Sequence, residues 1–140
     1  MRFDRWTNSS QPQTLQIGVI LLYIVGFSGL LGLLGILNTS TPYVLLFLKV
    51  DVRIHGAAYF VEAVACATYV ISGLLIANDQ RRGWISGIAV AAGGVVIPVA
   101  TVGFGAMVSS HYVISWLFDV ALFALLVHPQ SRSHQKIWFR

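Results

Sequence analysis

The 140-residue sequence has few charged residues and almost no cysteine. Charged side chains make up 10% of the chain, against roughly 25% in soluble domains. Hydrophobic residues make up 56%, and the mean hydropathy is +0.76. This composition excludes an ordinary soluble domain and predicts a protein of the lipid bilayer. The single cysteine, Cys66, excludes an intramolecular disulfide and a CxxC redox motif, and hence a thiol-disulfide enzyme acting alone.

Metal-binding motifs are also missing. No HxxxH or ExxH spacing occurs along the chain. His55 would lie about 10 Å from Glu62 along a helix, because the rise is about 1.5 Å per residue. That separation is too large for one coordination sphere. We therefore expect no intrinsic metal or other cofactor, and a quinone or pigment only through a partner.

Four apolar stretches fill most of the chain, and each approaches or exceeds the length of about 20 residues that a transmembrane helix needs. They span residues 15–37, 54–77, 84–108 and 112–127. The first is too long and too far from the N-terminus for a removable signal peptide. The pattern predicts an all-α polytopic membrane protein, with residues 1–140 forming a single antiparallel four-helix transmembrane bundle.

The basic residues predict an orientation for this bundle. If both termini are cytoplasmic, Lys49 and Arg53 lie outside and the other seven of the nine basic residues lie inside. This N-in, C-in arrangement follows the positive-inside rule. The net charge of +4 is thus explained by the membrane, and we expect no nucleic-acid partner. We expect the basic tail at 128–140 to bind anionic lipid. The expected location is a prokaryotic plasma membrane or an energy-converting membrane.

The outer connection at 38–53 shows a short alternation. Charged residues at positions 49, 51 and 53 alternate with apolar residues at 50, 52 and 54. Such a period of two predicts an extended or amphipathic segment at the membrane interface. A solvated connection, whose charges simply stay in water, fits the same pattern.

Small residues favour close helix packing in two of the stretches. In the first, glycines recur every third residue, at Gly26, Gly29, Gly32 and Gly35. This thin side lets another helix approach, either within the chain or from a partner. The third stretch is rich in glycine and contains Pro98, where we expect a kink.

Two acids in the apolar stretches are the main candidates for function. Glu62 and Asp119 should lie at matched depth, each about 12 Å below the outer boundary. Buried acids must be paired, protonated or next to water. Spacings of three and four place polar residues on the same face as each acid: His55, Tyr59, Cys66 and Tyr69 with Glu62, and His111 and Ser115 with Asp119.

Three roles remain open for these acids. If the two carboxyl groups face each other, repulsion lets the pair hold one proton near neutral pH, and the hydroxyl and imidazole groups could form a proton relay or ion site. Alternatively, each acid is protonated and bonded to a nearby hydroxyl, and only fixes the helix register. A ligand pocket is the third role.

The middle third of the chain resembles the DoxX-like family of small four-helix membrane proteins. The resemblance consists of Glu62 early in the second helix, the run Gly73-Leu74-Leu75, and Arg81 in the following basic turn. Members of that family are linked to quinone-associated or redox complexes. The resemblance therefore implies a respiratory context and a component of a quinone-linked oxidoreductase.

These features favour an accessory subunit of a larger, energy-converting membrane complex, with other membrane subunits as partners. A small homo-oligomeric transporter or channel for protons or cations is the alternative. We expect no enzyme activity from the chain on its own.

Overall fold

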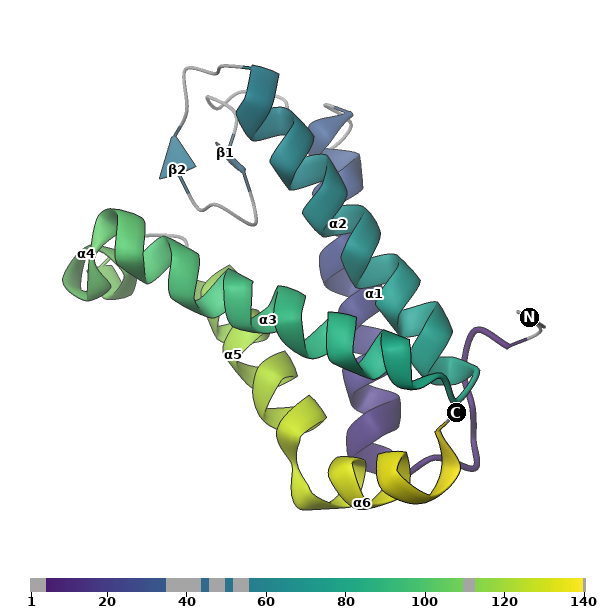
Figure 1. Ribbon diagram of the computed structural model, residues 1–140. Coiled ribbons are helices and arrows are strands. Elements are labelled where there is room, and N and C mark those ends of the chain that lie inside the picture. Colours follow the sequence, from purple (N-terminus) through teal and green to yellow (C-terminus); the bar gives the residue numbers. More distant parts are fainter. Residues whose placement is uncertain (1–4, 35–43, 46–49, 52–55, 110–112, 140) are drawn as a thin grey trace.

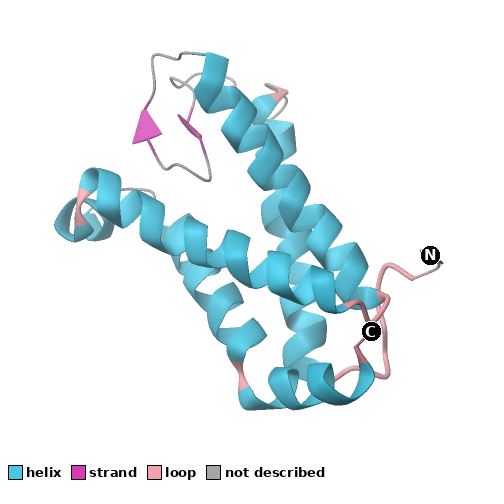
Figure 2. Cartoon of the chain, in the orientation of Figure 1, coloured by secondary structure: helices cyan, strands magenta, loops and turns pink. Residues whose placement is uncertain are grey.

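The computed structural model describes residues 5–34, 44–45, 50–51, 56–109 and 113–139. Figures 1 and 2 show that these residues are almost entirely helical. The helices are α1 (Gln13–Leu33), α2 (Gly56–Ala77), α3 (Arg81–Val102), α4 (Phe104–Ser109), α5 (Val113–Val127) and α6 (Pro129–Trp138). The strands β1 (Val44–Leu45) and β2 (Val50–Asp51) pair antiparallel.

Helices α1, α2 and α3 are each long and apolar enough to cross a membrane. A fourth crossing is reached if α5 and α6, which meet at 52°, are taken as one bent span. Many large apolar side chains on α1, α2 and α5 are exposed, among them Ile20, Phe60 and Leu117. Because exposed apolar side chains are favourable only away from water, these surfaces indicate contact with lipid. The prediction of an all-helical, multi-pass membrane protein is therefore confirmed at this level.

The four longest helices pack around one core. Helix α1 contacts α2 and α5, and α3 contacts the same two helices. Gly26 allows the first of these contacts, since a Cβ atom there would lie 2.7 Å from Val70 Cγ2 and 2.9 Å from the Cys66 carbonyl oxygen. The core consists mainly of fully buried apolar side chains, including Leu15, Val19, Leu22, Tyr69, Ile76, Ala91, Leu122 and Leu126.

The prediction of one continuous helix at 84–108 is wrong. Helix α3 begins earlier, at Arg81, passes through Pro98 and ends before Gly103. Gly103 has φ +85°, a conformation that favours glycine and ends a helix. The short α4 follows it.

The segments at the two ends of the long helices contain a helix and a short strand. The basic tail is largely the helix α6, which packs on α5 and α1. Pro129 stands at its first turn, where a proline costs no hydrogen bond. On the opposite side of the molecule, extended backbone at Val50–Asp51 falls within the alternating segment of the connection at 38–53. Figure 1 places α6, the start of α1 and the α2–α3 turn at one end of the molecule, which we call the terminal end.

Candidate functional site

Both acids of the apolar stretches are buried. Glu62 on α2 and Asp119 on α5 are each 1% exposed. A carboxylate at the centre of a bilayer costs at least about 2.5 kcal/mol, so such a side chain needs a proton, a hydrogen-bond donor or a cation. We refer to Glu62 and Asp119 as the acid pair.

Tyr69 provides a donor to one of these acids. Its hydroxyl donates to Asp119 Oδ1 at 2.8 Å, a bond that joins α2 to α5. The same hydroxyl lies 3.3 Å from the Val90 carbonyl oxygen on α3. Tyr69 itself is 1% exposed, so the bond forms away from water. A hydrogen bond in such surroundings is electrostatically stronger than in water.

Cys66 lies beside the other acid. Its thiol is 3.8 Å from Glu62 Oε1, one helical turn away on α2, and can donate to it weakly. Glu62, Cys66 and Tyr69 follow one another on one face of α2, and Tyr69 bonds Asp119, so the four buried side chains form one cluster.

Gly94 on α3 leaves the space that this cluster occupies. A Cβ atom at this position would lie 2.7 Å from the Tyr69 hydroxyl oxygen and 2.8 Å from Asp119 Cγ. These distances are shorter than real Cβ contacts allow. The backbone of α3 thus closes one side of the Tyr69–Asp119 bond, and any larger residue at this position requires Tyr69 or Asp119 to shift.

The other predicted site residues are half-buried or lie outside the described structure. Ser115 is half-buried on α5, one turn before Asp119. Tyr59 belongs to α2, but its side chain is outside the described residues, as are His55 and His111. Of the glycines on α1, Gly26 and Gly29 are buried and Gly32 is half-buried, while Gly35 is not described.

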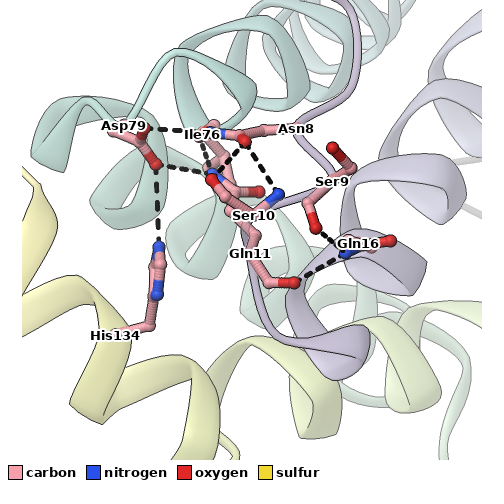
Figure 3. A network of polar contacts seen from close by, with 8 residues as sticks. All are labelled: Asn8, Ser9, Ser10, Gln11, Gln16, Ile76, Asp79 and His134. Atoms are coloured by element: carbon pink, nitrogen blue, oxygen red, sulfur yellow. Dashed lines mark hydrogen bonds and ion pairs between the residues drawn. The ribbon is translucent and has the colours of Figure 1, made fainter.

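A second polar cluster closes the terminal end (Figure 3). Asp79, in the α2–α3 turn, accepts hydrogen bonds from Asn8 at 2.9 Å and from Gln11 at 2.8 Å. Gln11 also donates to the Ile76 carbonyl oxygen at 2.7 Å. His134 Nε2 of α6 lies 3.7 Å from Asp79 Oδ1. We call these residues the terminal cap, because they join the N-terminal segment, the turn and α6.

Further contacts fix the same three segments. The Thr14 and Ser131 hydroxyls are 3.0 Å apart, linking α1 to α6. The Asn78 side chain donates to the Arg5 carbonyl oxygen at 2.9 Å. Asp79 has φ +56°, a left-handed conformation that aspartate tolerates better than most residues.

The sequence did not point to Gly94 or to the terminal cap. Gly94 is one of several glycines in its helix, and no local pattern shows which of them faces Tyr69 and Asp119. The cap could have been suspected from Gln11 and Asp79, polar residues at the edge of apolar stretches. Comparisons with protein-family models, curated proteins and solved structures gave no match to this chain.

Proposed function

We propose that this chain is an accessory subunit of a larger membrane complex, and that its acid pair binds and releases protons there. The observation that carries the proposal is the burial of Glu62 and Asp119 at 1% exposure, together with the Tyr69 hydroxyl that bonds Asp119. Two carboxyl groups in one buried cluster are costly to ionise together, and this cost favours the sharing of a proton.

The proposed arrangement has four antiparallel crossings, formed by α1, α2, α3 and the bent pair of α5 with the start of α6, with both termini in the cytoplasm. Support comes from the exposed basic side chains along three segments of the terminal end: Arg5, Arg81, Arg82, Arg132 and Lys136. Such an excess of arginine and lysine is typical of the cytoplasmic face.

A partner complex would meet the outer faces of the helices. At Gly26, the glycine side of α1 packs against α2 within the chain. The exposed apolar residues on the outside, such as Ile24, Phe60 and Leu117, remain for lipid or for neighbouring subunits. The resemblance of Glu62, Gly73-Leu74-Leu75 and Arg81 to DoxX-like proteins favours a redox complex as the partner.

Helix α6 is proposed to bind anionic lipid headgroups. Ser131 and Gln135 are buried against the rest of the chain, whereas Arg132, Lys136 and Trp138 are exposed. Cations next to an indole are typical of segments that lie at an anionic membrane surface.

Infrared spectroscopy tests the proton site directly. In lipid, the purified protein should show a protonated carboxyl band that changes with pH, because a buried carboxyl group retains its proton and absorbs apart from carboxylates. Glu62→Gln and Asp119→Asn should each reduce this band, since neither amide can be protonated in this way. Asp79→Asn, outside the acid pair, is the matched control and should leave the band unchanged. A band that survives in both variants would refute the proton site.

Co-purification tests the role as a subunit. Native mass spectrometry after extraction in mild detergent should recover the chain together with other polypeptides in fixed ratio. Recovery of this polypeptide alone, as a monomer or homo-oligomer, would contradict the subunit proposal. A homo-oligomer with an intact carboxyl band would instead favour a small transporter.

A further inference from the structure

A cavity of about 180 Å³ lies at the terminal end, lined by Ser10, Asp79, His134 and Trp138. We propose that this cavity binds a primary ammonium group that is linked to a phosphate. The ethanolamine headgroup of a phospholipid and free phosphoethanolamine both carry this chemistry. The cavity residues do not belong to the acid pair, so the proposal goes beyond the proposed function.

Asp79 supplies a carboxylate with unused acceptor capacity. Figure 3 shows that its oxygens receive hydrogen bonds from Asn8 and Gln11. Both donors are neutral amides, and a carboxylate has about four lone-pair sites, so further bonds can form. His134 Nε2 lies 3.7 Å from Asp79 Oδ1, which is beyond hydrogen-bonding distance. The Asp79 side chain is 33% exposed, so a ligand can reach it.

A hydroxyl group and two aromatic rings complete the lining. The Ser10 hydroxyl donates to Asn8 Oδ1 at 2.6 Å, so its oxygen can still accept a hydrogen bond from a ligand. The rings of His134 and Trp138 are stacked at an interplanar angle of 28°, with centroids 6.2 Å apart. An indole ring attracts cations through its quadrupole. The cavity therefore combines a negative charge, a hydroxyl acceptor and an indole.

This combination fits a primary ammonium better than a trimethylammonium group. A primary ammonium has three N–H donors for the oxygens of Asp79 and Ser10, and its charge attracts the carboxylate. A trimethylammonium group has the same charge but no donor, so it would leave these acceptors unpaired. The site should therefore distinguish two headgroups that differ only in their methyl groups.

The volume of the cavity limits how much of a ligand it can hold. At about 30 Å³ per water molecule, it corresponds to roughly six waters. Pockets for drug-sized ligands are larger, at roughly 300–1,000 Å³. An ethylammonium group fits this space, whereas the remainder of a phospholipid must stay outside it.

Basic residues around the cavity favour an ammonium that carries a phosphate. Arg81, two residues beyond Asp79, is exposed, and so is Lys136 on α6. These cations would repel a simple amine, but they attract a phosphate attached to the ammonium. A zwitterionic headgroup satisfies both signs of charge.

The position of the cavity favours a lipid as the source of this headgroup. Trp138 lines the cavity and is 63% exposed, and its neighbour Ile137 is 73% exposed. Tryptophan next to exposed apolar and basic residues is typical of the headgroup region of a membrane. With the terminal end at the cytoplasmic surface, as proposed above, the cavity lies at the level of the headgroups.

Lipid titration followed by native mass spectrometry tests the site. The full-length protein in detergent is titrated with phosphatidylethanolamine and with phosphatidylcholine of the same acyl chains. Both lipids are zwitterionic, so the comparison isolates the N–H donors. Phosphatidylethanolamine should bind at least about tenfold more tightly, because its ammonium can donate to a carboxylate. Equal binding of the two lipids, or binding of neither, would overturn the proposal.

Two variants assign this difference to the cavity. Asp79→Asn should weaken phosphatidylethanolamine binding at least about tenfold, and Trp138→Leu about two- to fivefold. Trp6→Leu is the matched control, because Trp6 is 60% exposed and does not line the cavity. If thermal unfolding shows that Asp79→Asn loosens the terminal cap, Trp138→Leu alone decides. Binding as tight in Trp138→Leu as in Trp6→Leu would refute the site.

Competition identifies the source of the ammonium. Displacement of the lipid by soluble phosphoethanolamine at similar concentration indicates a free ligand, whereas retention of phosphatidylethanolamine indicates the lipid. Both results support the ammonium site. The infrared carboxyl band should be the same in Trp138→Leu and in the wild type, so failure of the ammonium site and failure of the proton site can be told apart.

Discussion

At the position of Gly94, the backbone of α3 comes so close to a buried hydrogen bond that a side chain fits only if the bonded groups move. The Tyr69 hydroxyl and the Asp119 carboxyl group fill the space that a Cβ atom would need. The polar cluster thus depends on Gly94, which has no side chain. The absence of a side chain leaves room for α3 to pack against the Tyr69–Asp119 hydrogen bond between α2 and α5.

We expect Gly94→Ala to destabilise the protein, because the added methyl group must displace Tyr69 or Asp119. Overpacking of this kind costs about 1–3 kcal/mol. Thermal unfolding in detergent should show a lower midpoint, and the pH response of the infrared carboxyl band should change.

Gly105→Ala is the matched control. A Cβ atom at Gly105 would have nothing within 4 Å, and alanine is favoured over glycine in a helix by up to about 1 kcal/mol. This variant should be as stable as the wild type or more so. Equal stability of Gly94→Ala and the wild type would show that α3 does not constrain the bond.

At the scale of elements, α6 divides its residues between two environments. Its inner face bonds to the chain, with the Ser131 hydroxyl donating to the Leu125 carbonyl oxygen at 2.7 Å. Its outer face leaves Ile137 73% and Trp138 63% exposed, next to Arg132 and Lys136. The helix is therefore held by the protein on one side and free to meet a membrane surface on the other.

We expect the double substitution Arg132→Gln and Lys136→Gln to weaken the binding of phosphatidylglycerol. Each cation near an anionic surface contributes roughly 1 kcal/mol, so two correspond to about a 30-fold loss in affinity. Native mass spectrometry during a lipid titration measures this. Ser133→Ala, an uncharged change on the same helix, should have no effect. Equal binding of phosphatidylcholine by the wild type would contradict a charge-selective surface.

The elements differ in how well the sequence predicts them. The apolar stretches at 54–77 and 112–127 agree closely with α2 and α5, because polar residues mark their ends. Helix α6 could not be predicted in this way, since polar residues lie on both its inner and its outer faces. The end of α3 at Gly103 was also missed, because a glycine in an apolar run does not reveal its φ angle.

The candidate site could be predicted only in part, because a sequence pattern shows which residues share a helix face but not which residue they contact on another helix. Helical periodicity places Glu62, Cys66 and Tyr69 on one face, and all three are buried. It does not tell which residue of α2 meets Asp119. In the structure Tyr69, seven residues beyond Glu62, bonds Asp119. The Tyr69 side chain is long enough to reach α5, and Gly94 has no side chain that would fill the space between them.

At the scale of the whole molecule, the terminal end is held together by contacts between segments that are far apart in the sequence. The cap joins the N-terminal segment to the α2–α3 turn and to α6. Ile76, whose carbonyl oxygen accepts a hydrogen bond from Gln11, is fully buried.

The terminal cap also sets an order for biosynthesis. Thr14 bonds a residue 117 positions later, Ser131, and Gln11 bonds the backbone of Ile76, 65 positions later. At ribosomal speed, the first of these delays lasts on the order of 10 s. During that time Thr14 has no partner on α6, whereas Gln11 can already bond Ile76. The terminal end can therefore be closed completely only after the ribosome has translated α6.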